Sequence, residues 1–337
     1  TEHAVVRMSL LSLEFMQRAM LAAVLTGLAA PAVGTYLVQR RLALMGDGIG
    51  HVALTGVALG LLTGWAPVWT AVIVATAGAV AIELLRERRR ASADVALAML
   101  FYGGIAGGVL LIGLAGSSAA TLTSYLFGSV TTVSPADLWV IGVLAGIVLV
   151  LAIGLRPQLF AVCQDEEFAR VTGLPVRAYN LLIAVMAAVT VTMAMRTVGL
   201  LLVSALMVVP VATAQQLTRG FHTTLLLALA LGVAPSLAGI TFSYYVDVAP
   251  GAAIVVIALG GFLVAWPLGT YVRRRRQASV PGQEAEERLA GEHVTAEQHV
   301  HEHDETCGHP AVPHEDHVDY LHEGHLHARH ERHYDEH

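Results

Sequence analysis

Lysine is absent from this chain of 337 residues, in which all 20 residues of the Lys and Arg class are arginine. A phosphate-binding loop of the form GxxxxGK[ST] needs its lysine to reach the phosphates of a nucleotide. Such a loop is therefore excluded, and the sequence shows no other glycine-rich phosphate cradle. Any ATP hydrolysis that drives this protein must come from another polypeptide.

Cysteine and charge are also scarce. The two cysteines, Cys163 and Cys307, are too few for a disulfide framework. Charged residues make up only 14% of the chain, whereas hydrophobic residues make up 55% and fall in long runs. Several runs approach or reach the roughly 20 residues that cross a bilayer as a helix. We expect a polytopic, all-α membrane protein that lies in the lipid bilayer and has no nucleic-acid partner.

Nine apolar segments lie between the charged residues, and eight spans are the alternative because only one Arg and one Gly interrupt "AMRTVGLL". The segments are Phe15–Val38, Leu42–Leu62, Trp69–Leu85, Val95–Leu114, Leu138–Leu155, Tyr179–Met195, Val198–Leu217, Thr223–Phe242 and Ala252–Val272. We expect a helical bundle of eight or nine transmembrane helices. The short stretch "TSYLFGSVTTVSPADL" is expected to form an interfacial or a re-entrant helix.

The balance of charge changes sharply at Gln277. Residues 1–277 contain 17 Arg and 11 acidic residues, whereas residues 278–337 contain 3 Arg and 15 acidic residues. A break of this kind marks a domain boundary. We expect a transmembrane domain in residues 1–277 and a soluble tail in residues 278–337. The tail lacks apolar periodicity, so we expect it to be largely disordered.

Arginines predict the orientation of the bundle. They lie on alternate loops, among them Arg40 and Arg41, Arg156, Arg219 and Arg273–Arg276. The opposite loops "TGWAP", "AGSSAATLT" and "SYYVDVAPG" contain no arginine. Because basic loops tend to stay in the cytoplasm, the N-terminus is expected outside and the tail inside. The expected location is the inner or plasma membrane.

Asp47 and His51 lie within the second expected span, in "LALMGDGIGHVALTGVALG". Residues four apart share one helix face, so both side chains belong to the same space. Ionisable residues in the hydrocarbon region are costly and are functional suspects by default. A carboxylate and an imidazole are sound ligands for Zn²⁺ or Mn²⁺. The alternative is structural: Asp47 hydrogen-bonds His51 or a backbone amide and holds two helices together.

The longest polar insertion contains "DEEFARVTGL", which predicts a short amphipathic helix. Its acidic residues suit the positive end of the helix dipole, and a glycine followed by a proline ends it. Such a helix on the cytoplasmic face suits docking to a partner, although a solvated helix without a partner is the alternative. The residues assigned to this element are Asp165, Glu166, Glu167, Phe168, Arg170 and Gly173.

Five ordered segments together resemble the zinc/manganese family of ABC importer membrane subunits, over roughly Phe15–Val272. They are "LALMGDGIGHVALTGVALG", "YLFGSVTTVSPADL", "DEEFARVTGLPVRAYNLL", "RTVGLLLVSALMVVPVATAQQL" and "SYYVDVAPGAAIVV". The resemblance implies a permease of the zinc type, working as a homodimer with a cytoplasmic ATPase and an extracytoplasmic metal-binding protein. It also implies that Asp47 and His51 line the metal path and that Asp165–Gly173 contacts the ATPase. The metal is then substrate, and no tightly bound cofactor is expected.

The tail carries 13 of the 16 histidines, interleaved with acidic residues and one cysteine at irregular spacing. This composition predicts labile binding of several Zn²⁺ or similar ions, and it favours zinc because Mn²⁺ prefers oxygen ligands. A solvated acidic tail without a metal role is the alternative. The assigned residues are His299, His301, His303, Cys307, His309, His314, His317, His322, His325 and His327.

Asp247 lies in an outer loop, where it is either a contact for the binding protein or a solvated turn residue. Three other functions compete with import of a free ion. A cation-diffusion transporter needs a second intramembrane ligand pair, which the sequence does not offer. An intramembrane protease needs Asp47 to meet Asp94, which follows "RERRR" and is expected at the membrane surface. An importer of chelated metal has little reason to place a bare carboxylate and imidazole in its path.

Overall fold

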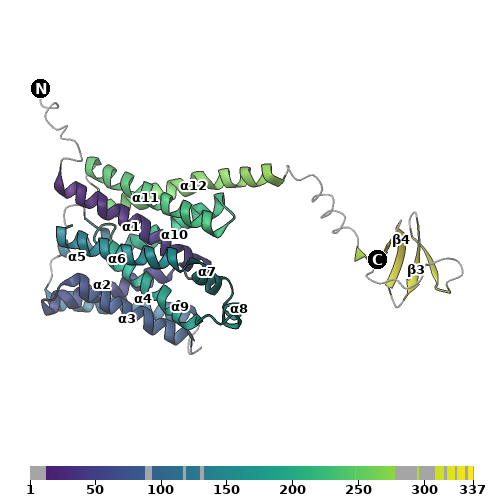
Figure 1. The fold of residues 1–337 in the computed structure, drawn as a ribbon, viewed down its shortest axis with the longest axis horizontal. Helices are drawn as coiled ribbons and strands as arrows, with labels where there is room; N and C mark the ends of the chain where they lie inside the picture. Colours follow the sequence, from purple (N-terminus) through teal and green to yellow (C-terminus); the bar gives the residue numbers. More distant parts are fainter. Residues whose placement is uncertain are drawn as a thin grey trace, which may run out of the picture. The chain divides into compact units, whose positions relative to one another are not determined.

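The chain forms a bundle of helices and, in its C-terminal part, a small β-sheet (Figure 1). The structure is a computed structural model that describes residues 13–87, 93–116, 119–129, 133–246, 248–277, 294–295, 308–314, 317–322, 325–330 and 333–336. The chain divides into two compact units, Thr1–Thr270 and Tyr271–His337.

Twelve α-helices are present in the described part of the chain. They are α1 (Glu14–Gln39), α2 (Met45–Thr63), α3 (Pro67–Glu87), α4 (Ala93–Ala115), α5 (Ala119–Phe127), α6 (Pro135–Gly154), α7 (Arg156–Gln164), α8 (Glu166–Val171), α9 (Val176–Ala194), α10 (Leu200–Leu217), α11 (Phe221–Val246) and α12 (Pro250–Gln277). Eight of these described helices are long and apolar enough to cross a membrane: α1, α2, α3, α4, α6, α9, α11 and α12. The ninth expected segment is α10, which is apolar but shorter. The prediction of an all-α bundle with eight or nine spans is confirmed.

Local sequence explains where helices begin and end. Before α6, the Ser134 hydroxyl accepts a hydrogen bond from the Asp137 amide, and the Asp137 carboxylate accepts one from the Ser134 amide. This reciprocal capping box satisfies two amides that a helix start leaves free. After α1, Arg41 takes a left-handed conformation with φ 59°, and the Leu42 amide donates to the Leu37 carbonyl. This bond is the Schellman ending of a helix, so the chain turns sharply toward α2.

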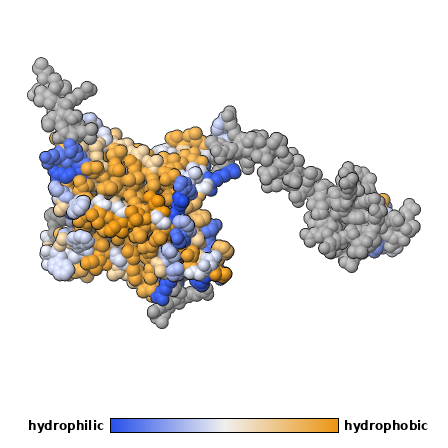
Figure 2. All heavy atoms as spheres, viewed as in Figure 1, coloured by the Kyte–Doolittle hydropathy of each residue, from blue (hydrophilic) through white to orange (hydrophobic). Residues whose placement is uncertain are grey.

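Burial separates central helices from peripheral ones. In α1, 72% of the most apolar 18-residue window is buried, whereas in α4 and α6 the share is 22%. Figure 2 shows a broad apolar surface on the helical unit, with hydrophilic residues gathered at its ends. Because a soluble protein rarely exposes so large an apolar surface, this surface faces lipid or another membrane subunit. The helical unit is a multi-pass membrane domain.

The short helix α5 is the helix expected in the "TSYLFGS" stretch. The residues after it pack against the connection between α9 and α10, where the Ser129 amide donates to the Arg196 carbonyl at 3.2 Å. Gly199 has φ +90° there, and a Cβ at this position would collide with the backbone of Phe127. Glycine is required because both the left-handed conformation and the close approach exclude a side chain.

The described residues of the tail form a five-stranded antiparallel sheet in the order β1-β5-β4-β3-β2. Its strands are β1 (Val294–Thr295), β2 (Ala311–His314), β3 (His317–His322), β4 (His325–His330) and β5 (His333–Glu336). The expectation of a tail largely without regular structure does not hold for these residues. Only two residues separate each strand from the next between β2 and β5, which is the shortest common hairpin connection. Backbone pairing between neighbouring strands can form without a long apolar pattern.

Candidate functional site

Helix α2 places Asp47 and His51 on one face inside the bundle. It begins at Met45, so Asp47 stands in the first turn and His51 lies one turn further on. The Asp47 side chain is partly buried, whereas His51 is only 7% exposed. A carboxylate suits the first turn because the amino end of a helix carries a partial positive charge. α2 itself packs against α3, α4, α9 and α10, so the pair occupies a central helix.

Helix α4 encloses His51 closely. The Phe101 ring meets the imidazole edge-on, with ring centroids 4.3 Å apart. One turn later, a Cβ on Gly104 would lie 2.6 Å from the carbonyl carbon of His51, and the Thr55 hydroxyl donates to the Gly104 carbonyl at 2.8 Å. The Nδ1 atom of His51 is buried and has no hydrogen-bond partner among the described residues. Buried polar atoms normally have partners, so this nitrogen is a candidate ligand atom.

Asp47 and His51 can hold a metal ion only in part. Zn²⁺ in a closed site usually takes four ligands, and this pair supplies two or three donor atoms. Among the side chains that the structure describes, no three from His, Cys, Asp and Glu gather into a metal site. The remaining positions around an ion are therefore open to water or to another chain. Incomplete coordination suits a transport site, because an ion must also leave it.

The predicted short helix is confirmed as α8 (Glu166–Val171). The Asp165 carboxylate caps it by accepting hydrogen bonds from the amides of Glu167 and Phe168, at 2.9 and 3.0 Å. Such a cap satisfies amides that have no partner within the helix. Gly173, with φ +84°, ends the turn after the helix. The local sequence therefore determines both ends of α8.

One edge of α8 is apolar and exposed. Phe168 is 64% exposed and Val171 is 86% exposed, whereas Ala169 is fully buried against Val162 and Val176. The buried side anchors the helix to the bundle. Exposed apolar side chains on a short, well-capped helix are suited to a protein partner.

Glu166 joins α8 to three membrane-spanning helices. Its Oε1 atom accepts hydrogen bonds from Arg40 Nη2 at 2.7 Å and from Asn180 Nδ2 at 3.1 Å. The Arg86 Nη2 atom lies 4.0 Å from the same oxygen and 2.7 Å from Glu83 Oε1. Arg40 follows α1, the Glu83–Arg86 pair belongs to α3, and Asn180 belongs to α9. The Arg40 side chain is 5% exposed, so these partners are needed to offset the cost of burying its charge.

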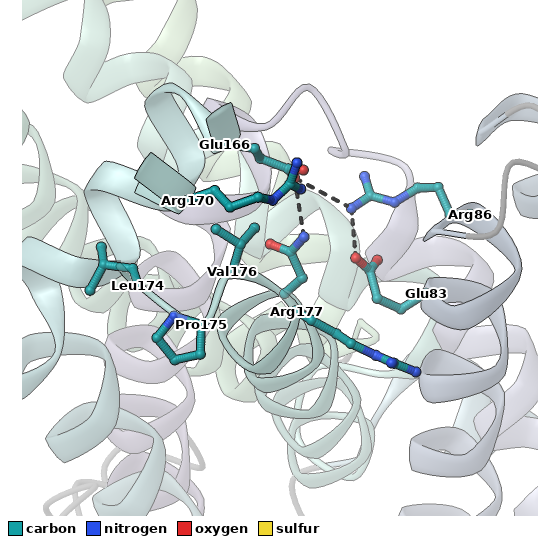
Figure 3. A pocket seen from close by; sticks show the side chains of 9 residues that line it. Glu83, Arg86, Glu166, Arg170, Leu174, Pro175, Val176 and Arg177 are labelled. Atoms are coloured by element: carbon teal, nitrogen blue, oxygen red, sulfur yellow. Dashed lines mark hydrogen bonds and ion pairs between the residues drawn. The ribbon is translucent and has the colours of Figure 1, made fainter. Parts of the chain in front are cut away.

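A cavity of about 540 Å³ opens beside this network, between α3, α8 and α9. Figure 3 shows the Glu83–Arg86 pair and Glu166 at its edge, with Arg177 reaching in another direction. Its lining residues are Glu83, Arg86, Glu166, Arg170, Leu174, Pro175, Val176, Arg177 and Asn180. The end of the bundle that carries α8 is therefore charged and hollowed.

Cys163, in α7, lies behind the same network. Burial raises the pKa of its thiol to about 12, with Arg40 lowering the pKa and Glu166 raising it. The thiol stays protonated at neutral pH and therefore lacks the reactivity of a thiolate. Cys163 is a structural residue.

Arg196 explains the interruption between α9 and α10. Its Nη2 atom lies 3.1 Å from Asp137 Oδ2, and its guanidinium lies 5.8 Å from the centre of the Tyr125 ring. The arginine that made the number of spans ambiguous is thus neutralised by the first turn of α6. Sequence reasoning missed this pair, as it missed Arg40, Arg86 and Asn180 as partners of Glu166. The sequence signal that could have revealed these ion pairs is an acidic residue at the end of an apolar span.

Several predicted site residues lie elsewhere. Asp247, His299, His301, His303 and Cys307 lie outside the described residues, as does the side chain of Asp94. The remaining tail residues lie in or beside the strands of the sheet: His309, His314, His317, His322, His325 and His327.

Eight long apolar helices, a carboxylate and an imidazole on a central helix, and a capped helix at one end define a multi-pass membrane subunit of a transporter. The chain belongs to the ABC 3 transport family, whose model matches residues 12–269. The relatives are membrane subunits of transport systems and not enzymes, and this family membership does not favour the cation-diffusion alternative.

Individual relatives cover nearly the whole helical unit. The chain is 36% identical over 258 residues to the manganese transport system membrane protein MntC of Halalkalibacterium halodurans, covering 76% of this chain and 88% of that protein. It is 31% identical over 265 residues to the manganese import system permease protein ScaB of Streptococcus parasanguinis, covering 78% and 94%. Among solved structures, PsaBC from Streptococcus pneumoniae in complex with Fab matches with a TM-score of 0.72 and 29% identity, covering 79% of this chain and 97% of that one.

Proposed function

We propose that this protein is the permease subunit of an ABC importer that carries a divalent transition metal ion into the cell. The observation that carries the proposal is the pair on α2: a partly buried Asp47 carboxylate with a buried His51 imidazole one turn away. The unpartnered Nδ1 atom of His51 supports a ligand role over a purely structural one. The names of relatives such as MntC and ScaB support a metal cargo.

The ion is held briefly and incompletely in this mechanism. Asp47 and His51 replace part of its hydration shell, and water or the same pair from a second copy completes the coordination. A homodimer would bring two such pairs together across its axis. Because two or three donor atoms do not close a zinc site, the ion is free to move on when the helices rearrange.

ATP hydrolysis is supplied by a separate cytoplasmic subunit in this proposal, since the chain has no lysine for a phosphate-binding loop. The exposed edge of α8, with Phe168 and Val171, is the proposed docking surface. Glu166 then passes movement of α8 to Arg40, which stands at the end of α1 only a short turn before α2. Docking and the metal pair are thereby connected through one ion-pair network.

The remaining partners follow from the same proposal. Arg40, Arg86, Arg156 and Arg219 mark the cytoplasmic side by the positive-inside tendency, so the tail is assigned to the inside. The proposed boundary of the transmembrane domain is Gln277, where the balance of charge changes. A metal-loaded solute-binding protein approaches from the opposite side, where Asp247 is a candidate contact. The protein lies in the inner or plasma membrane.

Two observations bear on which ion is carried. The 13 histidines of the tail favour zinc, because imidazole suits Zn²⁺ and Mn²⁺ prefers oxygen ligands. The names of the relatives MntC and ScaB favour manganese. We place zinc first and manganese second, and we assign the tail histidines to labile binding of the same ion.

ATP-driven uptake of radioactive zinc and manganese, measured in vesicles that contain this subunit with its ATPase, tests the proposal. Asp47→Ala and His51→Ala are expected to reduce uptake to background, since each removes half of the pair. His222→Ala is the matched control, because this exposed histidine belongs to α11 and not to the pair. A chain that ends at Gln277 is expected to keep its uptake.

Unchanged uptake in both point variants would make the pair structural and refute the proposed metal path. Zinc uptake that manganese does not compete with would identify zinc as the cargo, and the reverse result would identify manganese.

A further inference from the structure

The residues on either side of Phe101 fix helix α4 against α2. Leu100 is buried, and a Cβ added to Gly48 of α2 would lie 2.8 Å from its Cδ2 atom. One turn after Phe101, a Cβ added to Gly104 would lie 2.6 Å from the carbonyl carbon of His51. Small residues let two membrane helices approach this closely. The backbone that carries Phe101 is therefore held in place relative to α2 by contacts before and after it.

The Phe101 side chain uses this position to contact the His51 imidazole. The two ring centroids lie 4.3 Å apart, and the ring planes make an angle of 74°. An edge-to-face arrangement of this kind is among the preferred geometries of aromatic pairs. The Tyr102 ring contacts Phe101 in turn, with centroids 5.6 Å apart, and Tyr102 is 69% exposed. Phe101 therefore joins a buried imidazole to an exposed aromatic ring.

Hydrogen bonding at Nδ1 does not orient the His51 ring. A histidine that binds a metal usually donates its other ring N–H to a carboxylate, a carbonyl or water, and this partner fixes the orientation of the ring. The Nδ1 atom of His51 is buried and has no hydrogen-bond partner among the residues that the structure describes. The contact with Phe101 supplies an orienting surface of a different kind.

We propose that Phe101 is a positioning residue for the transported ion, which holds the His51 imidazole by ring packing in the orientation that meets the metal. The Phe101 side chain has no donor atom, so it does not bind the ion itself. It acts by restricting the rotation of the imidazole before the ion arrives. This inference rests on the proposed function, because it takes His51 as a ligand of the ion.

The expected consequence is on the affinity for the ion. A side chain that is already ordered loses less freedom on binding than one that must be immobilised by the ligand. Ring packing also leaves the imidazole less basic than a hydrogen-bonded carboxylate would, so it orients the ligand without making it bind tightly. Oriented but modest binding suits a site that must release its cargo.

Initial rates of ATP-driven zinc and manganese uptake over a range of metal concentrations test the proposal, in vesicles that contain this subunit with its ATPase. Phe101→Leu keeps an apolar side chain and removes the ring. It is expected to raise KM for the metal by about three- to tenfold, which corresponds to the strength of one aromatic contact. The maximal rate per folded subunit is expected to stay unchanged, because the ATPase contact and the release of the ion do not involve this ring.

Three further variants separate positioning from a general effect on folding. Phe101→Tyr retains the ring and is expected to keep the normal KM. Phe101→Met replaces the ring by a flexible apolar side chain, so it is expected to raise KM as Phe101→Leu does, and it serves if Phe101→Leu unfolds. Tyr102→Leu is the matched control, because it removes the neighbouring exposed ring from the same helix and is expected to leave KM unchanged. Thermal unfolding in detergent is measured for all of them.

His51→Ala in the same vesicles distinguishes failure of this inference from failure of the proposed function. If His51→Ala abolishes uptake while Phe101→Leu keeps the normal KM, the metal path stands and the positioning role is overturned. Equal increases of KM in Phe101→Leu and Tyr102→Leu, or a lower melting temperature with an unchanged KM, would overturn it as well. Normal uptake in His51→Ala would refute the metal path and the positioning role together.

Discussion

Gly104 sets how closely α4 approaches the histidine of the α2 pair. An added Cβ would lie 2.6 Å from the His51 carbonyl carbon, a distance that side chains do not occupy. The Phe101 ring, one turn earlier on α4, depends on this approach for its edge-on contact with the imidazole. The position of His51 is therefore controlled by a residue that carries no functional group.

Gly104→Ala tests this control, with Gly103→Ala as the matched variant on the same helix. We expect Gly104→Ala to lower the free energy of unfolding by about 1–3 kcal/mol, because an added methyl in a packed interface forces the backbone apart. Gly103 has nothing within 4 Å of the same added atom, so its alanine variant should be neutral or stabilise by up to about 1 kcal/mol. Thermal unfolding in detergent measures both. Equal melting temperatures would show that α2 and α4 can separate freely.

The sequence was sufficient to predict that Asp47 and His51 share one face of a helix, because a spacing of four places two residues on one helix face whatever the rest of the fold does. It was not sufficient to identify Arg40, Arg86 and Asn180 as partners of Glu166. These residues are far apart in the chain and meet only after α1, α3 and α9 have packed. A charged residue at the end of a span is visible in the sequence, but the residue that pairs with it is not.

Among the elements, α8 is the one whose attachment matters most for coupling. Glu166 accepts hydrogen bonds from Arg40, at the end of α1, and from Asn180 of α9. Its neighbour Glu167 is exposed, and only its backbone amide is bonded, to the capping carboxylate of Asp165. The two glutamates are adjacent in the first turn of the helix. Replacing each glutamate in turn therefore distinguishes loss of the ion-pair network from loss of a negative charge near the amino end of the helix.

Glu166→Gln is expected to raise the amount of ATP hydrolysed per metal ion imported, because α8 would move without carrying Arg40 with it. The lost interactions amount to about 1–2 kcal/mol, since the Glu166 side chain is 43% exposed and water screens part of the charge. Glu167→Gln is expected to leave the ratio unchanged. Metal uptake and phosphate release in the same vesicles give the ratio. A normal ratio in Glu166→Gln would remove the network from the coupling route.

The sequence predicted some elements correctly and missed others. The membrane-spanning helices and α8 were expected, because long apolar runs and strong caps are local signals. α7 was missed: its sequence "RPQLFAVCQ" is short and mixed, and it is stabilised by burying Leu159, Val162 and Cys163 against the bundle. The tail sheet was missed because its strands alternate histidines with few apolar residues, which does not resemble a half-buried strand.

At the scale of the whole molecule, the main apolar core of the helical bundle lies within one of the two compact units. All buried residues of its main apolar core belong to the described part of Thr1–Thr270, which forms one compact unit. The matched family region also ends at residue 269. Both observations support the proposed boundary near Gln277.

A chain that ends at Gln277 is therefore expected to unfold at the same temperature as the full chain, within about 2 °C, since less than about 1 kcal/mol should be lost. The measurement is thermal unfolding of both proteins in the same detergent and without metal. A truncated chain that aggregates or melts much lower would show that the tail belongs to the folded bundle.

The sequence by itself determined that this is a membrane bundle without a lysine-containing phosphate-binding loop, with a carboxylate and an imidazole on one helix face and a short capped helix in its longest polar insertion. These properties depend on composition and on spacing within single helices, which a chain cannot change by folding. Only the tertiary structure decided that Glu166 is bound by Arg40 and Asn180. It likewise decided that Gly104 lies directly against the backbone of His51. The reason is that packing and strand register bring together residues that are far apart in the chain or out of step with a helix, and no local pattern specifies such partners.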